Sequence, residues 1–305
     1  MSLSTEFQDA LGALEVPYRK ILLARRNGSY GHNTAVAGKS DVDMYIVYAA
    51  STEMVLVDPL EAKSSRLFKD GAHKIRLPVA IPTGEGTGES RVEEVGVDVH
   101  VYEVGKFFEL LVQGSPLAVE AVFGAALAAE REGYGDEVVV DGEMERVVEM
   151  RNAFLTRQAF RSLLGHAESE LRQIQVAEAM GNPYAKLLYH FARVMMEVEA
   201  VYAGNPLVVA WETGSENHTT LMAVKSMAMP GSDRQDLLRV LSQRHGELKV
   251  SDPYPESLPP PLEFSFPPLN QILFDIRSAN WVVPPATATA KASAASVKAE
   301  RSEDL

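Results

Sequence analysis

The spacing of apolar residues changes part-way along the chain. In the first hundred or so residues, short runs rich in β-branched and aromatic residues predict strands, and valines at every second position predict one more. The predicted strands are 21–24, 41–48, 74–81 and 95–101. From Glu103 onward apolar residues recur about every 3.6 residues, which predicts helices. The predicted helices are 103–113, 116–131, 143–164, 165–180 and 183–203. Strands followed by helices predict an α+β fold.

Other stretches complete the division of the chain. Residues 4–16 and 58–69 predict two more helices, and the glycine-rich residues 83–90 predict a loop. Seven prolines between positions 253 and 268 favour an extended surface segment, which a short helix near 268–278 follows. The run ATATAKASAAS near the end lacks bulky apolar residues, which predicts disorder. The expected divisions are a mixed α+β core at 1–135, a helical domain at 136–250, an extended segment with a short helix at 251–283, and a disordered tail at 284–305.

Composition narrows the class of protein. With 305 residues, of which 46% are apolar, the chain can bury a full core, and the absence of cysteine excludes disulfides and thiolate metal sites. The start MSLSTEFQDALGALE lacks the features of a signal peptide, and no apolar run approaches the roughly 18 residues of a membrane span. We therefore expect no membrane contact and an intracellular, cytoplasmic location. The net charge of −13 limits any nucleic-acid contact to a local footprint.

Candidate chemistry gathers around Gly28-Ser29. Glycine lets the backbone approach a phosphate closely, and a serine hydroxyl can bond its oxygens. Asp41 and Asp43 follow on one face of a predicted strand, where two carboxylates repel each other unless a cation lies between them. Asp98, which alternates with buried valines, can complete an oxygen site for Mg²⁺ or Mn²⁺ and accept a proton from an attacking hydroxyl.

These residues resemble a known signature. Gly28-Ser29 followed by Asp41 and Asp43 is similar to the motif of the DNA polymerase β superfamily of nucleotidyltransferases. The segment VDVHVYEVGKFFELLVQGSPLAVEAVFG resembles part of the predicted nucleotidyltransferases associated with RNA repair, and the likeness extends over about residues 20–204. One departure is that Tyr30 directly follows Ser29, where the family commonly has an arginine. The resemblance implies a polymerase-β-like mixed sheet as the catalytic core, followed by a helical domain that closes a nucleotide cleft.

A basic stripe on a predicted helix has two interpretations. Lys186, His190 and Arg193 recur at helical spacing, and they are similar to the Lys-x-x-x-His-x-x-Arg motif of the same family. The resemblance implies that they hold a triphosphate. The alternative is that they are ordinary flanking charges, with Glu197 pairing with Arg193 one turn further on.

The expected activity is magnesium-dependent transfer of an NMP from an NTP to a hydroxyl, with release of pyrophosphate. The metal ligands would be Asp41, Asp43 and Asp98, and Gly28 and Ser29 would hold a phosphate. RNA or another nucleic acid is the expected acceptor. Two alternatives remain open at this point: a protein hydroxyl as acceptor, which is AMPylation, and a non-catalytic binding or assembly subunit on the same fold.

Overall fold

The protein is built on a five-stranded mixed sheet with the strand order β3-β4-β2-β1-β5. The computed structural model describes residues 3–16, 18–35, 42–50, 70–82, 90–130, 138–250, 255 and 257–280. The strands are β1 (Tyr18–Asn27), β2 (Val42–Ala50), β3 (Gly71–Pro82), β4 (Ser90–Glu103) and β5 (Val138–Val140). β2 and β4 are parallel, and all other neighbours are antiparallel. The α+β class and the mixed sheet predicted from the sequence are thereby confirmed.

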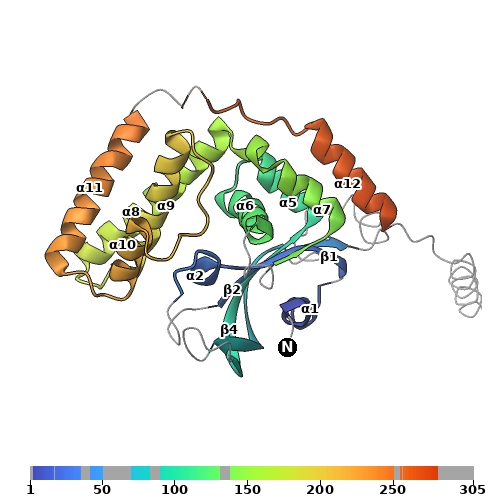
Figure 1. Ribbon diagram of the computed structural model, residues 1–305, viewed down its shortest axis with the longest axis horizontal. Helices are drawn as coiled ribbons and strands as arrows, with labels where there is room; N and C mark the ends of the chain where they lie inside the picture. Colours follow the sequence, from blue (N-terminus) through green and yellow to red (C-terminus); the bar gives the residue numbers. More distant parts are fainter. Residues whose placement is uncertain are drawn as a thin grey trace, which may run out of the picture.

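The two faces of the sheet carry separate hydrophobic clusters, as the period-two pattern of the strands requires. On one face Met44, Ile46 and Val99 pack with Phe7 and Leu11 of α1 (Leu3–Ala13). The other face is covered by helices that follow β4 in the sequence (Figure 1). These are α5 (Val104–Val112), α6 (Pro116–Glu130) and α7 (Gly142–Glu149).

The helical half of the protein, as far as the structure describes it, is formed by α8 (Arg157–Ala179), α9 (Ala185–Tyr202), α10 (Glu216–Lys225) and α11 (Gly231–Val250). The predicted break between the helices 143–164 and 165–180 is in the wrong place. The break lies earlier, where the short 3-10 helix Arg151–Phe154 ends and the Thr156 side chain accepts a hydrogen bond from the Ala159 N–H to start α8. Gly165 lies inside α8 and does not interrupt it.

The chain then returns from the helical half to the sheet. Residues 257–266 run along the top of the molecule in Figure 1 to α12 (Pro267–Ala279), which packs on α7 and α5. Arg157 fastens the start of this segment, because its backbone N–H and its Nε donate to the carbonyl oxygens of Pro259 and Leu258 at 2.9 and 3.2 Å. At the other end an Arg146–Asp275 ion pair of 2.6 Å joins α7 to α12.

Several elements predicted from the sequence differ from the structure or lie outside its described residues. β5 extends the sheet beyond residue 135, where we placed the end of the core. The predicted helix at 58–69, most of the loop at 83–90 and the predicted tail at 284–305 lie outside the described residues. No single helix in the described ranges has the length and apolar composition to cross a membrane. The helix pair Val104–Val112 and Pro116–Ala128, bent by 104°, reaches that composition only when taken together.

Candidate active site

A row of polar residues crosses four strands at one level of the sheet. Asp43 on β2 pairs in register with Asp98 on β4, with Asn27 of β1 on its other side. Lys74 of β3 pairs with Asp98, and its Nζ lies 3.4 Å from Asp98 Oδ1. Because residues directly paired across strands point to the same face, the carboxylates of Asp43 and Asp98 lie side by side on the face that the helices partly cover.

Gly28 packs directly against the carboxylate of Asp43. Its φ of +58° is one that side-chain-bearing residues rarely adopt, and a Cβ placed there would lie 1.8 Å from Asp43 Oδ2. β1 therefore ends in a turn that leaves the Asp43 carboxylate room beside the backbone. The turn continues as the single helical turn α2 (Gly28–Gly31) and carries Ser29.

Ser29 lies against a lysine that the sequence pattern did not single out. Lys225, the last residue of α10, donates from Nζ to Ser29 Oγ and to the carbonyl oxygen of Thr34, the latter at 2.8 Å. Its Nζ also lies 5.1 Å from the centre of the Tyr189 ring, and the Tyr189 hydroxyl contacts Thr34 Oγ1. The helical half thus places an ammonium group on the hydroxyl that we assigned to a phosphate.

Two neighbouring arginines hold the turn from opposite faces. Arg25 is buried, and it donates to the carbonyl oxygens of Glu120, Arg26 and Gly31 at 2.9, 3.1 and 3.3 Å. Arg26 is buried on the α1 side, where its Nη2 lies 3.0 Å from Glu6 Oε2. Both arginines are buried, so neither is exposed to a nucleotide or a nucleic acid. Their burial makes them supports of the turn.

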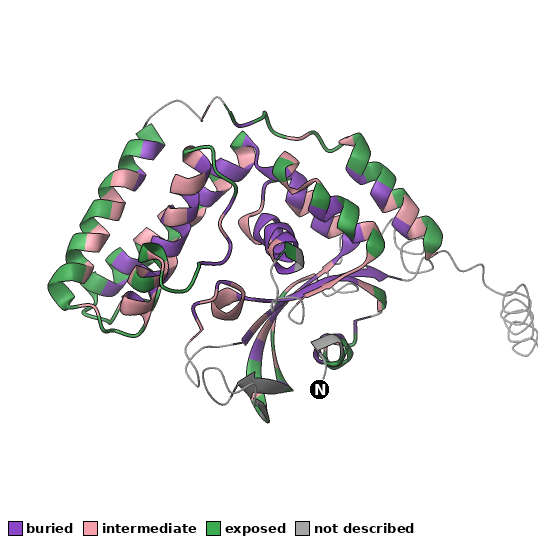
Figure 2. Cartoon of the chain, in the orientation of Figure 1, coloured by how far each residue is buried: buried purple, intermediate pink, exposed green. Residues whose placement is uncertain are grey.

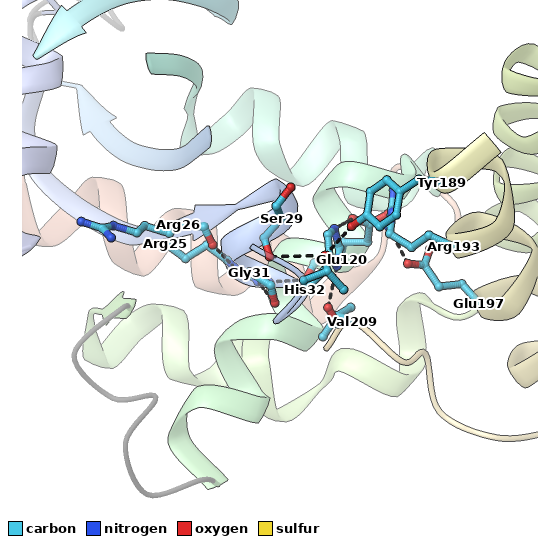
Figure 3. A network of polar contacts seen from close by, with 11 residues as sticks. Arg25, Arg26, Ser29, Gly31, His32, Glu120, Tyr189, Arg193, Glu197 and Val209 are labelled. Carbon is cyan, nitrogen blue, oxygen red and sulfur yellow. Dashed lines mark hydrogen bonds and ion pairs between the residues drawn. The ribbon is translucent and has the colours of Figure 1, made fainter. Parts of the chain in front are cut away.

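Arg193 is buried as well. Its Nη1 contacts Glu197 Oε1 at 2.5 Å and Glu120 Oε1 at 3.3 Å, so the pairing with Glu197 that the sequence left open is present (Figure 3). Burial lowers the pKa of Arg193, but the carboxylates of Glu120 and Glu197 together raise it by more. The net pKa is raised, and the guanidinium stays charged. Through these contacts Arg193 joins α9 to α6. They give no support to the assignment of Arg193 as a triphosphate ligand.

His32 extends this buried network to the phosphate turn. Its Nδ1 donates to the carbonyl oxygen of Val209 at 2.6 Å, and its Nε2 lies 3.7 Å from Glu120 Oε2 (Figure 3). Burial, followed by the charges of Arg193 and Arg25, lowers the pKa of His32 well below its ordinary value. The turn is consequently connected through Glu120 to Arg193 and the helical half.

The remaining members of the basic stripe are Lys186 and His190. Lys186 is exposed and His190 is half-buried on α9. Burial, followed by the charges of Arg193, Lys186 and Lys225, lowers the pKa of His190 to about 3. A histidine held neutral beside cations marks a positive region next to Ser29, which favours an anionic ligand.

The oxygen ligands fit a hard divalent cation as far as they are described. Asp43 and Asp98 offer neighbouring carboxylates, and the Gly28 backbone packs against one of them. Asp41, the third predicted ligand, lies outside the described residues. Within the described ranges, which lack that residue, no group of three or more Asp, Glu or His side chains is arranged to hold a metal ion.

No protein-family model and no curated protein matches the sequence. Among solved structures, the chain is similar to the crystal structure of a nucleotidyltransferase-like protein from Exiguobacterium sibiricum 255-15. The identity is 10%, the TM-score is 0.32, and the match covers 91% of this chain and 80% of that chain. A likeness of this size carries no argument about activity. The membership in the superfamily and the link to RNA repair stay predictions from the sequence motifs.

The site residues that sequence patterns missed are those brought in by tertiary packing. Lys225 lies 196 positions after Ser29, and no spacing rule joins the two. Glu120 sits in the apolar helix α6, where an acid among buried residues was the available signal. Lys74 is an exposed residue of a predicted strand, and its position beside Asp98 became apparent only from the strand register.

Proposed function

We propose that the protein transfers an NMP from an NTP to a hydroxyl acceptor. The observation that carries the proposal is the in-register pair Asp43 and Asp98, with the Gly28-Ser29 turn against Asp43 and the Lys225 ammonium on Ser29. Carboxylates in neighbouring positions attract a divalent cation, and a small-residue turn with an ammonium group beside it attracts phosphate. Together these groups suit a polyphosphate with its cation.

The residues have separate tasks in this proposal. Ser29 and Lys225 bind the β- and γ-phosphates, with Lys186 and His190 at the outer side of that positive region. Asp43, Asp98 and Asp41 would hold Mg²⁺ or Mn²⁺, which would neutralise charge on the phosphates. Asp98 accepts the proton of the acceptor hydroxyl while the hydroxyl oxygen bonds to the α-phosphorus. The bond from that phosphorus to the oxygen bridging to the β-phosphate breaks, and pyrophosphate leaves.

The buried network supports this task from behind. Arg25 fixes the carbonyl oxygen of Gly31, and Glu120 links His32 to Arg193. A turn fixed in advance loses less conformational freedom when it binds a phosphate. We infer that Arg193 acts as a positioning residue in place of the direct triphosphate contact first expected for it.

A labelling experiment tests the proposal. The protein is incubated with each α-³²P-labelled NTP, Mg²⁺ or Mn²⁺, and RNA, DNA or cell extract, and the labelled product is identified. Asp43→Asn is expected to abolish labelling while the melting temperature stays within a few degrees of the wild type. Asp9→Asn, which changes an exposed acid on α1, serves as the matched control. Full labelling by Asp43→Asn would end the proposal.

A further inference from the structure

The sheet face next to the carboxylates continues into an open basic surface on β3 and β4. In the described part of the chain, β3 alone pairs with β4 before Val97, because the pairing of β2 with β4 begins at Val42 and Val97. On the carboxylate face, β3 presents Lys74 at the edge of this two-stranded ribbon and Arg76 within it, with Gly96 opposite Arg76. All three are exposed, and a Cβ at Gly96 would meet nothing within 4 Å. Figure 2 shows exposed residues along this end of the ribbon.

The order of groups across the sheet fixes what this surface can contact. The phosphate turn follows β1, Asp43 is on β2, Asp98 is on β4, and Lys74 and Arg76 are on β3. In an in-line displacement the attacking and leaving oxygens lie on opposite sides of the phosphorus. With the triphosphate on the Ser29 side, the acceptor hydroxyl must approach from the side of Asp98. The acceptor therefore passes over Lys74 and Arg76.

The charge of this surface identifies the acceptor class. The protein as a whole carries a net charge of −13, yet Lys74 and Arg76 both lie on the strand next to Asp98. Lys74 has 87% of its side chain exposed, and its 3.4 Å contact to Asp98 leaves it accessible. Arg76 forms no ion pair with any residue that the structure describes. Two residues along a strand separate these cations by about 7 Å, a spacing suited to two phosphates of one extended polynucleotide.

We propose that Lys74 and Arg76 bind the phosphodiesters next to the terminal hydroxyl of a single-stranded polynucleotide. This inference rests on the proposed nucleotidyl transfer and names its acceptor. The footprint is short, since Glu94 lies opposite Pro78 further along the same face and would repel phosphate there. The contact of Lys74 with Asp98 bears on its affinity for the acceptor. A cation bound by Asp43 and Asp98 would replace the Lys74 ammonium group at Asp98, and Lys74 would then be available to the acceptor.

The test measures binding and transfer separately. Binding of a 5′-fluorescein-labelled single-stranded RNA of about ten nucleotides is followed by anisotropy over a range of salt concentrations. In K74A/R76A the affinity is expected to fall about tenfold. The salt slope is expected to fall by about 1.4, which is about 0.7 for each phosphate that the variant no longer neutralises. The matched control is Arg19→Ala, an exposed arginine eight residues before Asn27 on β1, about 27 Å away along the strand.

In the transfer assay, K74A/R76A is expected to raise the KM for the oligonucleotide about tenfold and to leave the KM for the NTP unchanged. Unchanged RNA binding in the double variant, equal loss in Arg19→Ala, or label that enters only protein would overturn this inference and leave nucleotidyl transfer intact. If no acceptor is labelled by the wild type, the proposed function fails. The anisotropy measurement then still decides whether Lys74 and Arg76 bind a polynucleotide.

Discussion

Replacing Gly124 by alanine is expected to destabilise the protein, although alanine favours helices. Gly124 lies within α6, and a Cβ there would be 1.3 Å from Nη1 and 2.1 Å from Cζ of Arg25. The guanidinium must then leave its buried place and give up its hydrogen bonds to the carbonyl oxygens of Glu120 and Gly31. The turn that carries Ser29 would lose its support from within the core.

The magnitude follows from two opposing contributions. Breaking the contacts of a buried charge costs about 3–5 kcal/mol, and replacing glycine by alanine inside a helix returns about 1 kcal/mol. The free energy of unfolding is therefore expected to fall by about 2–4 kcal/mol in Gly124→Ala, measured by urea denaturation. Gly165→Ala is the matched control, because Gly165 lies within α8 and a Cβ there meets nothing within 4 Å. This control should gain up to about 1 kcal/mol.

A double-mutant cycle with Arg25→Ala isolates the cause. If the clash with the guanidinium is responsible, Gly124→Ala should cost little once Arg25 is already alanine. An equal loss in both backgrounds would refute the reasoning, and so would a Gly124→Ala protein as stable as Gly165→Ala.

Two further predictions concern the links between the turn and the helical half. Lys225→Ala is expected to weaken NTP binding about 10- to 100-fold in calorimetry, since charge-assisted contacts contribute about 1.5–3 kcal/mol; Lys249→Ala, which removes an exposed pair with Glu168, should change little. Burial raises the pKa of Glu197 from 4.5 to about 8, against the lowering effect of Arg193. The folded protein therefore holds the proton more tightly than the unfolded chain, and the stability contributed by this group is lost as the pH rises from about 4.5 to about 8. Urea denaturation of Glu197→Gln should show a smaller loss over that range; a wild-type slope in the variant would contradict the assignment.

Local patterns predicted those parts of the fold that local patterns determine. The alternating valines of β4 placed Asp98 on the face opposite Val97 and Val99, and the structure pairs it in register with Asp43. The 3.6-residue period predicted α9 within two residues at its start and one at its end. β5 is three residues long and was missed, because so short a strand has no measurable period.

The division of roles within the candidate site depended on packing. Arg193 follows Lys186 and His190 at helical spacing, but that spacing does not tell which side of α9 meets Glu120. Lys225 ends a helix of weak amphipathic character and acquires its position from contacts of α10 with α9. Long-range contacts of this kind have no signature in a single sequence.

The hydrogen bonds of Arg157 to the segment 257–266 bear on how the two halves are held together. The chain passes from the sheet to the helical half at Thr156 and begins its return near Pro259, and the two passages are hydrogen-bonded to each other through Arg157. Both covalent connections thus meet at one point. The opposite margin is held by noncovalent contacts such as those of Lys225 with Ser29 and Thr34. Loss of the Lys225 contacts would loosen the phosphate region and leave the carboxylate row of the sheet, which strand pairing holds, undisturbed.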